Sequence, residues 1–251
     1  MFLAIDFDLD VVRRFLFNTE IRQGAWLTLQ VAVLAQLLGI ILGVLFALMR
    51  ISRNPVSNAL AGFYVWFFRG TPALLQLFIL YFGVPQFFDN QTVTNELTAF
   101  RAAIVAFGVN EGSYMTEIVR AGILSVESGQ MDAAKSLGMT NMQAMRRVIL
   151  PQALRVVVPP TGNEFIAMLK NSSLASAIGL VELLGASRLV YSVNFKIMEL
   201  LVVAAIWYLA FTTVFSILQA ELERVLAVGD RDRPETLFSR AMAIMGGRRE
   251  T

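Results

Sequence analysis

Long apolar stretches constrain this chain more than any other feature of its sequence. Of its 251 residues, 56% are hydrophobic and only 16% are charged, and the apolar residues are grouped in runs instead of lying at amphipathic spacing. A helix needs about 20 mostly apolar residues to cross the hydrocarbon core of a bilayer. The sequence therefore predicts an all-α, polytopic membrane protein with about five transmembrane helices and little room for a second, soluble domain.

Five apolar segments are the expected transmembrane spans. They cover about residues 24–49, 56–88, 97–124, 156 to beyond 170, and 200–222. The second segment is interrupted after Arg69, where Thr71 is expected to cap a new helix that begins with Pro72. In the first segment, Gly39 and Gly43 have the Gly-x-x-x-Gly spacing that lets two helices pack closely.

Basic residues indicate how the chain crosses the membrane, because Arg and Lys are enriched in cytoplasmic loops. The region after the last span contains Arg224, Arg231, Arg233, Arg240, Arg248 and Arg249. We therefore expect a cytoplasmic C-terminus and, with an odd number of spans, an N-terminus outside the cell. The outer connection near residues 89–96 contains no basic residue, which agrees with this orientation.

The chain is expected to divide into three parts. Residues 1–23 form an N-terminal segment with an amphipathic interfacial helix over residues 10–18. Residues 24–227 form the transmembrane domain, and residues 228–251 form a cytoplasmic tail.

The composition also excludes several kinds of chemistry. The chain contains no Cys and no His, so it lacks disulfides, thiolate metal sites and the commonest general base. It offers no paired aspartates at membrane depth, which argues against an intramembrane enzyme. We expect no catalytic residue, no metal site and no nucleic-acid partner.

The most polar internal connection, residues 125–151, predicts a hairpin of two short helices on the cytoplasmic side. Ser128 can cap the first helix, Asp132 is expected in its first turn, and Gly138 is placed to end it in the left-handed conformation. From the residues alone, this hairpin packs either on its own membrane domain or on another protein.

The second helix of the hairpin has clear boundary residues of its own. Thr140 and Gln143 have the spacing of a capping box. Pro151 is expected to stop the helix, since proline lacks the amide hydrogen that the helical ladder requires.

The hairpin resembles the cytoplasmic loop of ATP-binding-cassette importer permeases, in which Glu-Ala-Ala, Gly and Ile-x-Leu-Pro follow one another. Here the matching residues are Asp132-Ala133-Ala134, Gly138 and Val148-Ile149-Leu150-Pro151. Asp132 and Val148 depart conservatively from that pattern. The resemblance to the polar-amino-acid uptake subfamily extends over about residues 24–225. It includes Arg69-Gly70-Thr71-Pro72, Asn163-Glu164-Phe165 and Lys170-Asn171-Ser172-Ser173.

This resemblance implies a type I importer fold and a subunit that moves polar or charged amino acids across the bacterial inner membrane. It implies a paired second permease, identical or distinct, a dimer of ATPase subunits and an extracytoplasmic solute-binding protein. The residues expected to couple to the ATPase are Asp132, Ala133, Ala134, Gly138, Leu150 and Pro151. The chain has no Gly-x-x-x-x-Gly-Lys-Ser/Thr loop, so it binds no cofactor itself and ATP with Mg is expected on the partner.

Two charged residues are expected near the middle of the membrane, where charge is costly and points to function. We hypothesise that Thr71 and the amides after it receive a substrate carboxylate, that Arg69 strengthens the field, and that Glu164 faces an ammonium group or a cationic side chain. Gln76 and Asn163 would supply supporting polar contacts. The expected substrate-binding residues are therefore Arg69, Thr71, Gln76, Asn163 and Glu164.

Several alternatives stay open at this level. Arg69 and Glu164 could instead pair with each other or with a partner permease and never touch substrate. Glu117 and Arg120, three residues apart on one helix, are expected to form a structural ion pair. A channel or secondary carrier that needs no ATP is the alternative function, and the identity of the transported amino acid is undecided.

Overall fold

The computed structural model describes residues 7–88 and 96–226, and this part of the chain is helical without a β-strand, as predicted. The helices are α1 (Leu9–Leu16), α2 (Thr19–Ile51), α3 (Pro55–Gly70), α4 (Ala73–Phe78), α5 (Val84–Phe88), α7 (Ala99–Leu124), α8 (Ser128–Ser136), α9 (Asn141–Ala144), α10 (Leu150–Asn171), α11 (Leu183–Asn194) and α12 (Ile197–Leu226). Two π-helical turns join neighbouring helices, Ile79–Gly83 before α5 and Met145–Ile149 before α10, and a 3-10 segment, Ser172–Ile178, follows α10. The predicted tail at residues 228–251 and most of the outer connection lie outside the described residues.

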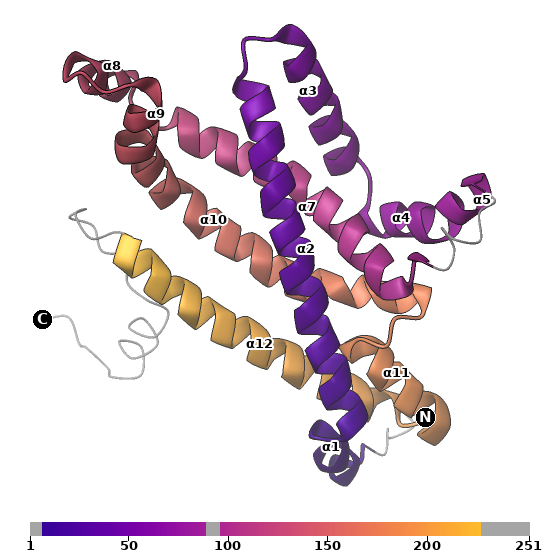
Figure 1. The fold of residues 1–251 in the computed structure, drawn as a ribbon. Helices are drawn as coiled ribbons and strands as arrows, with labels where there is room; N and C mark the ends of the chain where they lie inside the picture. Colours follow the sequence, from indigo (N-terminus) through magenta and orange to yellow (C-terminus); the bar gives the residue numbers. More distant parts are fainter. Residues whose placement is uncertain (1–6, 89–95, 227–251) are drawn as a thin grey trace, which may run out of the picture.

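The helices are arranged between two ends of the molecule (Figure 1). The hairpin of α8 and α9 and the connection between α2 and α3 lie at one end, whereas α1 and α11 lie at the opposite end. The long helices α2, α7, α10 and α12 run between these ends, and α4 and α5 turn away to one side.

Within the described residues, α2 and α12 are each long and apolar enough to cross a membrane. Two further candidates are bent pairs: α3 with the segment 73–87 turns by 103°, and the helical stretch 141–178 with α11 turns by 47°. Helix α7 has 26 residues but is more polar, so the number of five spans stays a prediction.

Close packing of α2 on α7 forms the centre of the bundle, as the glycine spacing predicts. A Cβ added to Gly39 would lie 2.5 Å from Cγ of Glu111, and one added to Gly43 would overlap Cβ of Met115. Glycine thus lets the two backbones approach more closely than any side chain at these positions would allow. This packing places the face of α7 that carries Glu111 against α2.

The first described helix is held against the last. The indole Nε1 of Trp207 on α12 donates to the carbonyl oxygen of Leu16 at 2.7 Å, and Val12 of α1 is buried. Asp10 and Arg13 form an exposed ion pair on the other side of α1. The helix predicted over residues 10–18 is therefore present as α1 and is amphipathic, with one buried and one exposed face.

Three predictions about the ends of the hairpin helices are wrong. Glu127, not Ser128, occupies the N-cap position of α8, and Asp132 lies beyond the first turn. Pro151 does not stop the second helix, which widens into the π turn at Met145–Ile149 and continues as α10. A π turn accommodates the missing amide hydrogen of a proline. The capping box of Thr140 with Gln143 is confirmed.

We predict that Gly43→Ala lowers the thermal unfolding temperature of the detergent-solubilised protein, because the new methyl group would press α2 away from Met115. Overpacking of this kind costs about 1–3 kcal/mol. Gly83→Ala is the matched control, since a Cβ there meets only Ile79 at 3.9 Å. Equal unfolding temperatures for the two variants would contradict the packing argument.

Candidate functional site

A cavity of about 520 Å³ lies where the break after α3 faces α7 and α10. It is lined by Arg69, Gly70, Thr71, Pro72, Ala73, Phe107, Asn110, Glu111, Tyr114, Glu164, Met168 and Asn171. The α7 residues recur at positions 107, 110, 111 and 114, and the α10 residues at 164, 168 and 171. Both sets have the spacing of a single helix face, so the cavity has two helical walls and one wall formed by the break.

The break itself is the predicted interruption, but its capping differs from the prediction. Helix α3 ends at Gly70, and Thr71 occupies its C-cap position, whereas Pro72 is the N-cap of α4 and provides no side-chain capping bond. The Thr71 hydroxyl donates to the carbonyl oxygen of Phe67 at 2.9 Å. Thr71 therefore completes the helix behind it and does not begin the one ahead.

Gln76 and Asn110 bond the polar backbone groups that the break exposes. Nε2 of Gln76 lies 3.0 Å from the carbonyl oxygen of Phe68, 3.1 Å from that of Thr71 and 2.7 Å from the Thr71 hydroxyl. Nδ2 of Asn110 donates to the same Phe68 oxygen at 2.8 Å and to Oε1 of Gln76 at 3.1 Å. Because unpaired carbonyl groups are costly in a membrane, these two amides hold the break in its bent shape.

Arg69 and Glu164 line the same cavity without pairing. The guanidinium of Arg69 lies over the ring of Tyr114, 5.1 Å from its centroid, which is the geometry of a cation–π contact. Within the described residues, neither Arg69 nor Glu164 forms an ion pair. Both charges are thus available to a bound molecule, and the pairing of one with the other is not observed.

The remaining predicted residues lie outside the cavity surface. Gln76 is buried behind the break, where it bonds the backbone. Asn163 is exposed and is not among the lining residues, because it precedes Glu164 on α10 and lies about 100° around the helix from it. The geometry gives Gln76 a bracing role and leaves Asn163 without one.

Sequence reasoning missed Asn110, Glu111 and Tyr114 as cavity residues. Glu111 is only 4% exposed, and its Oε1 accepts from Nε2 of Gln36 at 3.3 Å. A carboxylate in the middle of a helix that is expected to cross a membrane is itself a functional signal. The spacing of Glu111 from Phe107 and Tyr114 could have identified this face of α7.

Comparison with known proteins decides the family. The model of the binding-protein-dependent transport system inner membrane component matches residues 39–228 of this chain. The chain belongs to this family. The resemblance inferred from the hairpin at residues 125–151 and from the motifs around it is thereby confirmed.

Similar members of this transport family are amino-acid permeases by name. The arginine transport system permease protein ArgU of Corynebacterium glutamicum is 42% identical over 246 residues, which cover 94% of this chain and 76% of the relative. The nopaline transport system permease protein NocM of Agrobacterium fabrum is 38% identical, over 75% of this chain and 80% of its own. The L-cystine transport system permease protein TcyL of Bacillus subtilis is also 38% identical, over 75% and 79%.

Solved structures of transporters share the fold of this inner membrane component. The crystal structure of an amino acid ABC transporter with histidines has a TM-score of 0.77 at 38% identity, over 88% of this chain and 99% of that one. The MetNI methionine ABC transporter in an inward-facing conformation has a TM-score of 0.65 at 20% identity, over 82% and 96%. The similarity to the methionine transporter, at 20% identity, shows a shared fold only.

The hairpin of this family member exposes most of the residues predicted to couple to an ATPase. Asp132, Ala133, Gly138, Leu150 and Pro151 are exposed, whereas Ala134 is buried. Gly138 has φ +79°, so the predicted left-handed helix end is confirmed. Beside these residues, Leu137 and Met142 are 80% and 75% exposed, which gives the tip of the hairpin an apolar surface.

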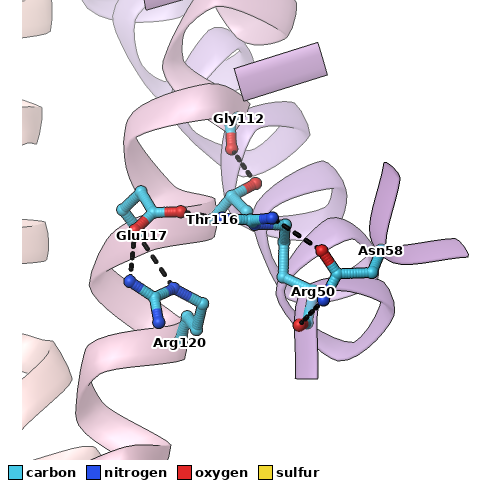
Figure 2. Close-up of polar contacts among 6 residues, drawn as sticks. All are labelled: Arg50, Asn58, Gly112, Thr116, Glu117 and Arg120. Atoms are coloured by element: carbon cyan, nitrogen blue, oxygen red, sulfur yellow. Dashed lines mark hydrogen bonds and ion pairs between the residues drawn. The ribbon is translucent and has the colours of Figure 1, made fainter. Parts of the chain in front are cut away.

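An ionic cluster joins three helices near the root of this hairpin. Figure 2 shows Arg50 of α2, Asn58 of α3, and Glu117 and Arg120 of α7. Nη1 of Arg50 donates to Oδ1 of Asn58 at 2.8 Å, and Nδ2 of Asn58 donates back to the Arg50 carbonyl. Glu117 pairs with Arg120 at 2.8 Å, as predicted, and its other oxygen lies 3.9 Å from Nε of Arg50. Within this cluster, the contact between Arg50 and Glu117 links the α2–α3 connection to α7.

We predict that Gln76→Leu destabilises the permease by about 1–3 kcal/mol, because the carbonyl oxygen of Thr71 would lose its donor, whereas that of Phe68 would keep Asn110. The measurement is thermal unfolding in detergent. Leu75→Met, a change in the same turn with a half-exposed side chain, is the control. A loss no greater than that of the control would show that Gln76 does not brace the break.

Proposed function

We propose that this chain is the membrane-spanning permease subunit of an ATP-driven importer of polar or charged amino acids. The observation that supports this most directly is a single cavity, at a helix bent by 103°, that contains Arg69 and Glu164 without an ion pair between them. A zwitterionic amino acid offers one charged group for each. The names of the similar permeases support the same substrate class.

Arg69 and the break are proposed to bind the substrate carboxylate. The guanidinium is positioned by Tyr114, and the first amides of the helical segment after Pro72 lack intrahelical partners, as at any helix start. Glu164, on the α10 wall of the cavity, is proposed to bind the ammonium group. Thr71 also lines the cavity, and Gln76 holds the wall formed by the break in shape.

The chain is proposed to act with several partners and to catalyse no reaction itself. It contains no phosphate-binding loop of the Gly-x-x-x-x-Gly-Lys-Ser/Thr type, so ATP and Mg bind to a partner ATPase dimer. The exposed apolar tip at Leu137 and Met142 is a suitable surface for that subunit. A second permease, identical or distinct, completes the pathway, and an extracytoplasmic solute-binding protein delivers the amino acid.

The proposed orientation in the bacterial inner membrane has the N-terminus outside and the C-terminus in the cytoplasm. The hairpin end carries exposed Lys135, Arg146 and Arg147, which is the charge expected of a cytoplasmic end. Helix α1, at the opposite end, then lies at the interface on the outer face of the inner membrane.

Transport by the reconstituted complex tests the function and the site together. We expect uptake of radiolabelled arginine, glutamine or histidine into proteoliposomes only with ATP. Arg69→Gln and Glu164→Gln should each raise KM by about tenfold, since each removes one charge-assisted contact. Asn163→Ala, next to Glu164 but outside the cavity, should leave KM unchanged. Uptake without ATP would instead indicate a channel or secondary carrier, and an unaltered KM in both charge variants would refute the binding mode.

Docking of the ATPase is tested by a single charge at the hairpin tip. Leu137→Glu should abolish co-purification of the ATPase subunit, because it places a carboxylate on an apolar contact surface while disturbing no buried group. Val193→Glu is the matched control, since Val193 is 79% exposed, like Leu137 at 80%, and lies on α11 at the other end. Retention of the ATPase by the Leu137 variant would mean that the hairpin is not the docking site.

A further inference from the structure

The cavity contains a second carboxylate that the binding of a neutral amino acid does not use. Its charged lining residues are Arg69, Glu111 and Glu164, which give the lining a net charge of −1 when all are ionised. An amino acid with an uncharged side chain would pair with Arg69 and Glu164 and leave Glu111 uncompensated. A buried charge without a partner is strongly unfavourable.

Glu111 is oriented toward the cavity by its neighbours. Nε2 of Gln36 donates to its Oε1 at 3.3 Å, and Gly39 of the adjacent helix packs against its Cβ and Cγ. Its other oxygen, Oε2, has no hydrogen-bond partner among the described residues, yet it is not one of the fully buried unpaired atoms. The residue is 4% exposed and lines the cavity, so its carboxylate stands beside that space with one oxygen that no protein group bonds.

Glu182 shows how this protein treats a buried carboxylate of purely structural role. Glu182 is fully buried and accepts from the amides of Leu184 and Gly185 and from the hydroxyl of Tyr208, with the Thr28 hydroxyl 3.4 Å away. Both of its oxygens are therefore bonded. Glu111, by contrast, accepts from a single donor, Gln36, and lines a cavity.

We propose that Glu111 binds the cationic side chain of the substrate, so that the cavity selects amino acids with a guanidinium or ammonium side chain. This inference rests on the proposed function. The substrate carboxylate then faces Arg69, the α-ammonium faces Glu164, and the side-chain cation faces Glu111. A substrate of net charge +1 balances the cavity charge of −1. Gln36 acts as a positioning residue that donates to Oε1 and leaves Oε2 for the substrate.

The test compares L-arginine with L-citrulline, a neutral amino acid of nearly the same shape. Binding is measured by equilibrium dialysis on the purified complex of this chain with its partner subunits, without the solute-binding protein, so that the selectivity measured is that of the membrane cavity. The wild-type complex should bind arginine at least about tenfold more tightly than citrulline. Glu111→Gln should reduce this preference to about twofold or less, by weakening arginine binding and not citrulline binding.

Glu199→Gln is the control, since Glu199 is also a 4% exposed carboxylate but lies on α12 outside the cavity lining. It should keep the wild-type preference. Equal wild-type affinities for arginine and citrulline would overturn the inference without any variant, and so would an unchanged preference in Glu111→Gln. Either result leaves the proposed function standing, whereas a wild-type complex that binds neither ligand, nor glutamine, refutes both.

Discussion

The need to bond every backbone polar group within a membrane governs this structure. The chain interrupts a helix at Thr71 and turns it by 103°, which would expose carbonyl groups to an apolar medium. Gln76 and Asn110 bond those carbonyls with amide side chains and so allow the bend. The bend in turn opens the cavity and directs Arg69 into it. Two uncharged amides thus support a cavity with charged walls.

Helix α7 contributes to the cavity and to the ionic cluster. Its middle carries Asn110, Glu111 and Tyr114 on the cavity, and its later turns carry Glu117 and Arg120 in the ionic cluster. The chain then passes directly into the hairpin at α8. Its polar character, which weakens it as a membrane span, is the same property that builds these sites.

The sequence predicts the helices, the glycine contacts and the break well, because each depends on local spacing or on a conformation that one residue type favours. Gly138 and the capping box of Thr140 are of this kind. The predictions that Pro151 stops a helix and that Thr71 caps the next one are wrong. The π turn before Pro151 and the hydrogen bond from the Thr71 hydroxyl to the Phe67 carbonyl both depend on the preceding chain. Glu111 was missed as a site residue, since only the packing of α2 on α7 turns it toward Arg69 and Glu164.

The passage of the helix through Pro151 has a mechanical consequence. From Asn141 to Ile178 the chain is one helical stretch, with no loop between the hairpin and the cavity wall. Glu164 lies 14 residues beyond Leu150, about 21 Å along that stretch. The hairpin and the wall that carries Glu164 are therefore parts of one helical stretch, so a displacement of the hairpin would act on that wall along the helix, through the turn that contains Pro159 and Pro160.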